Sequence, residues 1–429
     1  MEKIQFQQLQ EELYHEKLDN GLEVYILPKQ GFNKTYATFT TKYGSIDNHF
    51  MPLGKNNYIK VPDGIAHFLE HKLFEKEDGD VFQQFSKQGA SANAFTSFTR
   101  TAYLFSSTSN VELNLETLMD FVQEPYFSEK TVEKEKGIIG QEIMMYDDNP
   151  DWRLYFGVIE NMYHHHPVRI DIAGTVESIS DITKDLLYEC YGTFYHPSNM
   201  LLFVVGPVHV DKIMEQIKTN QSKKQYDQVP DIRRKFESEP VEVAKTKQVL
   251  EMNVQTSKCL VGIKANKVEQ SGSEMLKNEL SLNIILDVLF GKSSENYHQL
   301  YSQGLIDDTF SFDYSQEQGF GFAIIGGDTK DPDKLADTLK NMLLTAKNGD
   351  LFTAEGLERT KKKKIGHFLR AINSPEYIAN QFTRYAFNKM NLFDIVPTLE
   401  SITLEDIKSC AADFISDDRF TVCHVVPKK

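Results

Sequence analysis

The sequence predicts an α+β protein of two homologous domains, each a mostly antiparallel sheet with helices packed on one face. Three observations lead to this prediction. With 429 residues, the chain exceeds the size at which a single hydrophobic core stops growing. Hydrophobic residues make up 40% of the chain, which is enough for large cores. Strand and helix patterns also follow one another in a similar order in the two halves, which suggests duplication of one α+β unit.

The first half alternates short strands with amphipathic helices. Asn20-Gly21 is a turn pair, and the alternating residues after it predict a strand over 22–28. β-Branched and aromatic residues predict a second strand over 35–43, which ends at Gly44. The same patterns predict helices over 64–74, 111–123 and 129–146, and strands over 101–106 and 200–205.

A polar segment separates the two halves. Between about residues 219 and 247 the apolar periodicity is lost, and Lys, Gln, Glu, Asp and Pro dominate, which predicts a linker. The expected domains are therefore residues 1–225 and 245–429. The lysine run 361–364 lies in a predicted helix and indicates a solvated face. The second half is predicted to contain strands over 259–265, 321–325 and 420–426 and helices over 274–289, 332–346, about 354–390 and 404–414.

The composition excludes several classes of protein. With 47 basic and 62 acidic residues the formal net charge is −15, so we expect no nucleic-acid partner, because phosphate binding needs a basic face. The absence of an 18-residue apolar run predicts no membrane span. The N-terminal residues lack a signal-peptide pattern, and the four cysteines are sparse and unclustered. We therefore expect a soluble, cytoplasmic protein with reduced thiols.

The strongest local motif is His67-Phe68-Leu69-Glu70-His71, inside the predicted helix 64–74. Positions i and i+4 of a helix project from one face, so His67 and His71 can offer two imidazole nitrogens to one ion. Glu70 stays on the same side, where it can hold a water molecule near that ion. A His-x-x-acid-His pattern arises by chance only about 0.05 times in a chain of this composition. The alternative is a pair of histidines packed in a helix seam without metal.

A catalytic zinc site also needs a third protein ligand and an open position for water. The predicted helix 129–146 offers Glu133, Glu135 and Glu142. Glu135 and Glu142 are two helical turns apart and share a face, so one can bind the metal while the other accepts a hydrogen bond from a ligand histidine. The alternative is a set of acidic surface residues. Three adjacent histidines, 164–166, cannot share a helical face and are predicted to form a polar loop.

His-x-x-Glu-His is the inverted zincin motif. Together with the Glu-x6-Glu spacing in EKGIIGQEIMMYDDNP, it resembles the pitrilysin/insulinase family of zinc metallopeptidases, in the branch of half-length, processing-peptidase-like chains. The resemblance is to the metal-bearing subunit of a bacterial paired peptidase. It extends over nearly the whole chain through NGLEVYILP, DGIAHFLEHKLFE, GASANAFTSFTRTAYLF, FYHPSNMLLFVVG and LFGKSSENYHQLYSQGLI, which fall in the family's order.

The resemblance implies a zinc-dependent endopeptidase that hydrolyses peptides or unfolded polypeptide segments, with the metal in the first domain. Matched residue by residue, His67, His71 and Glu142 are then the ligands of one Zn2+ ion per chain. Glu70 is the general base that activates the water, and Glu135 is the carboxylate that supports a ligand histidine. The distance along the chain from His71 to Glu142 is shorter than is usual in the family, which a shorter loop between the two helices would explain.

The resemblance also implies a substrate-binding segment. The segment Asn93-Ala94-Phe95-Thr96 resembles a family segment beside the site, whose strand edge and Asn hold the substrate backbone, and Asn93, Ala94 and Phe95 are the expected substrate-binding residues; the physical basis is β-augmentation. Without the resemblance, the same residues are an ordinary turn-to-strand stretch.

One departure from the family lies in the second domain. Members that act alone or as homodimers usually carry an Arg-x-x-x-Gly-Leu-x-Tyr-like stretch, whose Arg and Tyr reach the scissile carbonyl. Aligned on Gly304-Leu305, this chain has Leu300 in place of the Arg and Asp307 in place of the Tyr. The resemblance therefore implies a chamber formed with a related subunit that supplies both groups, and a homodimer is the alternative. Two other classes remain: a non-catalytic structural subunit, although such members lose the metal residues, and a peptide-binding module with a structural zinc, which would not need Glu70.

Overall fold

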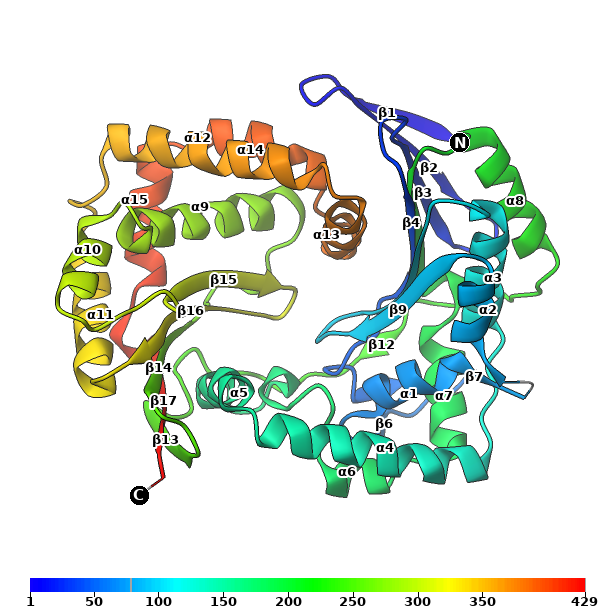
Figure 1. The fold of residues 1–429 in the computed structure, drawn as a ribbon, viewed down its shortest axis with the longest axis horizontal. Helices are drawn as coiled ribbons and strands as arrows, with labels where there is room; N and C mark the ends of the chain where they lie inside the picture. Colours follow the sequence, from blue (N-terminus) through cyan, green and yellow to red (C-terminus); the bar gives the residue numbers. More distant parts are fainter. Residues whose placement is uncertain (78, 429) are drawn as a thin grey trace. The chain divides into compact units, whose positions relative to one another are not determined.

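The structure is a computed structural model that describes residues 1–77 and 79–428. The chain forms two compact units (Figure 1). Both units combine a mixed sheet with helices, which confirms the predicted α+β class. Neither unit is a continuous stretch of chain, in contrast to the expected domains 1–225 and 245–429. Unit 1 comprises Met1–Ile143, Ile170–Phe236 and Ala371–Phe387, and unit 2 comprises Met144–Arg169, Glu237–Arg370 and Asn388–Lys429.

Unit 1 is built on a seven-stranded sheet with the order β1-β2-β3-β11-β4-β10-β9. Neighbouring strands are antiparallel except for β3 and β11, which are parallel. The central strands β4 and β11 are buried along their whole length. The strands are β1 (Glu2–Phe6), β2 (Glu11–Lys17), β3 (Glu23–Pro28), β4 (Thr35–Thr41), β9 (Ala90–Thr96), β10 (Thr101–Ser107) and β11 (Met200–Gly206); β5 (His49–Met51), β6 (Ile59–Lys60) and β12 (Arg233–Arg234) form a small sheet, as do β7 (Glu75–Lys76) and β8 (Gly79–Asp80).

The first helices of unit 1 cover one face of its large sheet (Figure 1). Aromatic side chains fill the interface: the ring of Phe121 lies 5.7 Å from that of Tyr103 on β10, and the ring of Phe85 lies 5.9 Å from that of Phe105. The helices that contact this sheet are α1 (Ile65–Phe74), α2 (Val81–Lys87), α3 (Val111–Gln123) and α8 (Val210–Ser222). Unit 1 also contains the first part of α4 (Glu129–Asp147), α6 (Val176–Ser180) and α7 (Lys184–Phe194).

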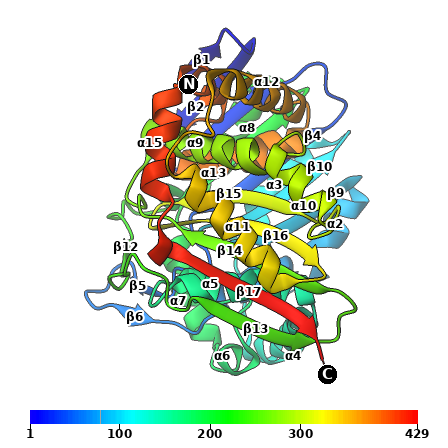
Figure 2. The same cartoon turned by 90° about the vertical axis from the view of Figure 1, so that its left-hand side faces the viewer.

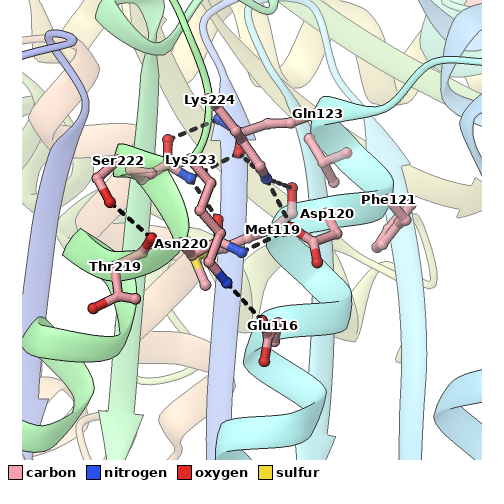
Figure 3. A network of polar contacts seen from close by, with 12 residues as sticks. Glu116, Met119, Asp120, Phe121, Gln123, Thr219, Asn220, Ser222, Lys223 and Lys224 are labelled. Carbon is pink, nitrogen blue, oxygen red and sulfur yellow. Dashed lines mark hydrogen bonds and ion pairs between the residues drawn. The ribbon is translucent and has the colours of Figure 1, made fainter.

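A polar network fastens the end of α8 to α3 (Figure 3). Lys224 Nζ lies 2.8 Å from both Asp120 Oδ1 and Gln123 Oε1. Asn220 Nδ2 donates to the same oxygen of Asp120 at 2.8 Å. The expected linker therefore does not begin near residue 219, because α8 continues to Ser222 and its end is bound within unit 1.

Unit 2 is built on a five-stranded sheet with the order β13-β17-β14-β16-β15, whose strands lie side by side in Figure 2. One pair, β13 and β17, is parallel, and the other pairs are antiparallel. The strands β3, β11, β4, β10 and β9 of unit 1 have the same topology, which is the repeat that the similar order of elements predicts. The strands are β13 (Lys247–Met252), β14 (Ser257–Lys264), β15 (Ser311–Glu317), β16 (Phe320–Thr329) and β17 (Phe420–Pro427).

Helices cover both faces of the unit 2 sheet. Helix α11 lies against β14, β16 and β17, whereas α5 lies against β13, β14 and β17 from the other side. Gly262 of β14 permits this close approach of α5, because a Cβ there would lie 2.2 Å from Met162 Cε. The helices are α5 (Pro150–Met162), α9 (Gly272–Phe290), α10 (Glu295–Ser302), α11 (Pro332–Ala346), α12 (Ala354–Ala371), α14 (Ile395–Ser401) and α15 (Leu404–Phe414).

Each unit contains one helix that comes from the other half of the sequence, and this is called the exchange of α5 and α13 (Pro375–Phe387) below. Helix α13 comes from the second half of the chain but covers β4 and β11 of unit 1, and Phe382 packs on Tyr25 and Phe203 with ring centroids 4.8 Å apart in both cases. Helix α5 comes from the first half and covers the sheet of unit 2. Each sheet therefore carries helices on both faces, whereas the sequence predicts helices on one face.

The predicted helix over about 354–390 is wrong, because the chain forms two helices there. Helix α12 ends at Ala371 and α13 begins at Pro375. Proline has no backbone N–H, and its ring would clash with the preceding turn, so it begins a helix more readily than it continues one. The Ser374 hydroxyl accepts a hydrogen bond from Tyr377 N at 3.2 Å and caps the second helix.

The lysine run 361–364 is only in part the solvated face that the sequence indicates, because Lys362 and Lys363 are exposed whereas Lys361 is buried. Lys361 is only 7% exposed, and its Nζ donates to the Glu400 carbonyl oxygen at 3.1 Å. Lys363 Nζ lies 2.7 Å from Asp287, a buried carboxylate of α9. This run therefore fastens α12 to its neighbours within unit 2. Among the helices of the described residues, no stretch is long and apolar enough to cross a membrane.

Candidate metal centre

Helix α1 (Ile65–Phe74) carries the His-x-x-Glu-His motif and is buried on almost every side. It begins at Gly64, which has a φ of 90°, and a Cβ there would lie 2.3 Å from the carbonyl oxygen of Ala173. The polar residues His67 and Glu70 are each only 8% exposed. Buried polar side chains of this kind require partners from neighbouring elements.

Helix α4 (Glu129–Asp147) brings two carboxylates to this motif. Glu142 Oε1 lies 3.8 Å from His67 Nε2, and Glu142 Oε2 lies 3.6 Å from His71 Nε2. Glu135, two turns earlier on the same face of α4, lies 3.1 Å from His71 Nδ1. The structure thus brings the two histidines of α1 and both carboxylates of α4 together within unit 1.

The donor atoms fit a zinc ion. One ligand atom from each of His67, His71 and Glu142 lies within 4.8 Å of the other two, and over residues 1–77 and 79–428 this is the one such group of three or more. Donors at zinc distances of about 2.0–2.1 Å lie about 3.3 Å apart in a tetrahedron, slightly closer than the separations to Glu142. Two imidazoles and a carboxylate are also the donor set of some catalytic zinc sites, in which water takes the fourth position. Glu133 is not part of the group, because it is exposed and pairs with Lys136 at 2.6 Å.

The environment of His67 favours the neutral form that binds a metal. Burial, followed by the charge of nearby His71, lowers the pKa of His67 to about 4. The two imidazole rings lie 4.6 Å apart between centroids. Nδ1 of His67 is buried and has no hydrogen-bond partner in the described residues, so no hydrogen bond at this atom orients the ring.

The hydrogen bond between His71 and Glu135 orients the second histidine. Burial opposes the charged form of His71, but the hydrogen bond to Glu135 and the carboxylates of Glu70 and Glu142 outweigh burial and raise its pKa. Burial would also raise the pKa of Glu135, but the hydrogen bond to His71 lowers it. With Nδ1 directed at Glu135, the Nε2 atom of His71 faces Glu142, which is the orientation that a metal ligand needs.

Glu70 lies next to these ligands and has the properties of a general base. Burial raises the pKa of Glu70 to about 7, although a hydrogen bond from Thr96 opposes the shift. Thr96 Oγ1 donates to Glu70 Oε2 at 2.6 Å. A carboxylate with a pKa near the working pH is suited to taking and returning a proton.

Asn93, Ala94 and Phe95 lie in β9 (Ala90–Thr96), the edge strand of the unit 1 sheet. Strand β10 pairs with one side of β9, with Tyr103 opposite Ala94. No strand pairs with the other side in the part of the chain that the structure describes. Such an edge can accept an extended peptide as a further strand.

Thr96, at the end of β9, belongs to the segment that the resemblance singles out, but the sequence assigns it no role of its own. Its contact with Glu70 depends on how β9 lies against α1, which local patterns do not reveal. The only signal in the sequence is its place as the last residue of the segment Asn93-Ala94-Phe95-Thr96.

The two positions that depart from the family pattern lie in unit 2. Leu300, in α10 (Glu295–Ser302), is fully buried. Asp307 lies in the turn after this helix, and its carboxylate accepts hydrogen bonds from the backbone N–H and the hydroxyl of Thr309 at 2.9 and 2.6 Å. An aliphatic side chain and a carboxylate held in its own turn cannot replace a guanidinium and a phenol.

Two family descriptions match the chain. Residues 58–176 match the description "Insulinase (Peptidase family M16)", and residues 181–364 match "Peptidase M16 inactive domain". The first range contains α1 and α4, and therefore all the residues of the candidate metal centre.

Similar proteins cover the whole chain. The uncharacterized zinc protease YmfH of Bacillus subtilis (strain 168) is 69% identical over 425 residues, which is 99% of both chains. The structure of a putative M16-like peptidase from Alicyclobacillus acidocaldarius has a TM-score of 0.94 and 39% identity, and the match covers 97% of this chain and 99% of that one. A protease from Helicobacter pylori shares the fold, with a TM-score of 0.82 at 20% identity over 97% of this chain and 99% of that one. This chain therefore belongs to the insulinase family of peptidases, peptidase family M16.

Proposed function

We propose that the protein is a zinc-dependent endopeptidase that hydrolyses peptides or unfolded polypeptide segments. The observation that carries the proposal is the group formed by two imidazoles and one carboxylate, those of His67, His71 and Glu142, with which the carboxylate of Glu70 interacts electrostatically through His71 and Glu142. The zinc proteases among its relatives support the same assignment.

Each residue of the centre has a distinct part in the proposed reaction. His67, His71 and Glu142 hold the metal, and Glu135 fixes the orientation of His71. When bound, a zinc ion supplies a Lewis acid that lowers the pKa of water to about 7 and polarises a carbonyl group. Glu70 takes a proton from the attacking water and delivers it to the leaving amine.

The unpaired edge of β9 supports an extended peptide as the substrate. A peptide added there would receive backbone hydrogen bonds along Asn93, Ala94 and Phe95, and its alternate side chains would face the two sides of the sheet. A folded protein could not offer a free strand of this kind, so unfolded or short chains are the preferred substrates.

The proposal includes a second subunit. Leu300 and Asp307 cannot stabilise the negative charge that develops on the scissile carbonyl, so a related chain that carries an Arg and a Tyr would complete the site in a shared chamber. The alternative partner is a second copy of this chain. A cytoplasmic location remains a prediction from the sequence, as does a role in peptide processing.

The decisive experiment measures zinc content and peptide cleavage for the parent and for Glu70→Gln, each assayed alone and with the related subunit. We expect one zinc ion per chain in both proteins. Cleavage should be lost on chelation and should fall by at least about 1,000-fold in the variant, because the general base is missing. A variant that binds zinc and cleaves as fast as the parent would show that the protein is not this kind of hydrolase. A matched control is Glu133→Gln, since Glu133 is exposed on α4 away from the centre.

A further inference from the structure

The hydroxyl of Thr96 can donate one hydrogen bond, and the surrounding groups determine which atom accepts it. An ionised carboxylate only accepts hydrogen bonds, so Thr96 Oγ1 must donate to Glu70 Oε2, which lies 2.6 Å away. Thr101 Oγ1 lies 3.3 Å from the same hydroxyl and can itself donate to the Tyr43 carbonyl oxygen at 2.9 Å. Thr96 thus occupies one oxygen of Glu70 and leaves Oε1 to take a proton from water.

The backbone on either side of Thr96 is held in place. On one side, β9 pairs with β10 along its whole length, with Thr96 opposite Thr101, which is fully buried. On the other side, the turn after β9 is bound to the chain that follows β4: Ser45 N donates to the Ser97 carbonyl oxygen at 3.1 Å. The close approach requires Gly44, because a Cβ there would lie 2.4 Å from the Phe98 carbonyl oxygen.

The same residue ends the strand edge at which a peptide would be added. Thr96 is the last residue of β9, and Asn93, Ala94 and Phe95 directly precede it. Its backbone therefore belongs to the proposed peptide-binding ladder while its side chain holds the proposed base. A shift of β9 by even one residue would break the contact with Glu70.

We infer that Thr96 is a positioning residue, which directs the free oxygen of Glu70 at the water and ties the base to the strand that holds the substrate. This inference rests on the proposed peptidase function. It assigns to Thr96 a hydroxyl-dependent role, as opposed to a packing role that any side chain of similar shape could fulfil.

The test compares Thr96→Val, which keeps the shape but removes the hydroxyl, with Thr96→Ser, which keeps the hydroxyl. A matched control is Thr40→Val, since Thr40 is a buried threonine of the same sheet whose hydroxyl has no hydrogen-bond partner in the described residues. For each protein, assayed together with the related subunit, we would measure zinc content, kcat and KM, and determine the crystal structure around Glu70.

We expect Thr96→Val to lower kcat by about 10- to 100-fold, the value of one hydrogen bond to a charged group, with zinc content and KM close to those of the parent. The kcat of Thr96→Ser should stay within about threefold of the parent value, and Thr40→Val should leave kcat unchanged. The crystal structure of Thr96→Val should show the Glu70 carboxylate in a changed or mixed orientation.

Three results would overturn the inference: an unchanged kcat in Thr96→Val, an equal loss in the Val and Ser variants, or an unmoved Glu70 in the crystal structure of Thr96→Val. Failure of the proposed function itself gives a different pattern, because Glu70→Gln would then be as active as the parent. The crystallographic comparison tests the positioning role in that case as well.

Discussion

Glu239 illustrates how a single carboxylate can organise a local structure in unit 2. The backbone N–H groups of His164, His165 and His166 all donate to it at 2.8 Å. Lys264 Nζ, which is almost completely buried, lies 2.6 Å from the same carboxylate. Burial would raise the pKa of Glu239, but the hydrogen bonds from Lys264 and from the three backbone groups lower it to about 2. The three histidines therefore act through their backbone at this site.

We predict that Glu239→Gln lowers the free energy of unfolding by about 2–3 kcal/mol at pH 7. Because the folded pKa lies below the ordinary value of 4.5, the carboxylate stabilises the fold fully above pH 4.5 and loses this effect as the pH falls towards 2. Urea unfolding at several pH values between 3 and 7 should show the difference from the parent shrinking as the solution becomes more acidic. Glu237→Gln is the control, because that side chain is 73% exposed. A difference that stays constant down to pH 3 would contradict this explanation.

The residues of the candidate centre differ in how far local sequence could predict their place. His67 and His71 share a helical face by spacing alone, and the same argument relates Glu135 to Glu142. That α4 lies against α1 could be expected only from the family resemblance. Thr96 could not be assigned, because its contact with Glu70 arises from the packing of a distant strand on α1.

Helix α4 carries both carboxylates of the candidate centre, Glu135 and Glu142, and also contains two glycines. Between Glu135 and Glu142 it contains Gly137 and Gly140, and a Cβ at either position would meet no atom within 4 Å. Neither glycine has the positive φ at which glycine is favoured. Glycine inside a helix is about 1 kcal/mol less favourable than alanine, so neither packing nor backbone geometry within the described residues accounts for this pair.

We predict that Gly137→Ala raises the free energy of unfolding by about 0.5–1 kcal/mol, because alanine restricts the unfolded chain and favours the helix. Thermal and urea unfolding would measure the gain. The control is Gly44→Ala, which should destabilise the protein, because its Cβ would lie 2.4 Å from the Phe98 carbonyl. If Gly137→Ala instead weakens the protein or its assembly, another chain must approach α4 closely at this point.

Local sequence signals were sufficient to predict the boundaries of some helices but not of others. Helices α11 (Pro332–Ala346) and α15 (Leu404–Phe414) form over the predicted residues, because Pro332 and the Thr403 capping box mark their first turns. The continuous helix over about 354–390 was wrong, since its amphipathic pattern persists across Pro375. The sequence also does not predict α5 (Pro150–Met162). Asn149 and Pro150 indicate only the end of the helix 129–146 in the sequence, whereas in the structure Asn149 also caps α5 and Pro150 is its first residue.

The exchange of α5 and α13 makes the two units interdependent. The sheet of unit 1 receives α13 from residues 371–387, and polar contacts add to the apolar ones: Lys42 Nζ donates to the Phe387 carbonyl oxygen at 2.9 Å. A single cut near residue 236 would therefore leave each sheet without one of its helices. Length and composition predicted two domains, but they could not predict this exchange, because it depends on which sheet each helix reaches.

We predict that a fragment of residues 1–236 exposes the sheet face around Tyr25 and Phe203 and aggregates, because Phe382 no longer covers it. Sedimentation and binding of a hydrophobic dye would measure this. The same fragment with residues 371–387 joined through a flexible linker is the control, and it should remain more soluble and bind less dye. If both fragments are monomeric, fold cooperatively and bind little dye, α13 is not needed to cover the sheet.

Because α13 lies late in the sequence, the strands of the unit 1 sheet are synthesised well before the helix that covers them. Strand β11 completes the centre of the unit 1 sheet at Gly206, but the helix that covers this face ends about 180 residues later, at Phe387. At ordinary translation rates this interval lasts roughly 10–40 s. During that time the apolar face of the sheet around Tyr25 and Phe203 lacks the helix that covers it in the finished protein, and such exposed surface favours aggregation of the growing chain.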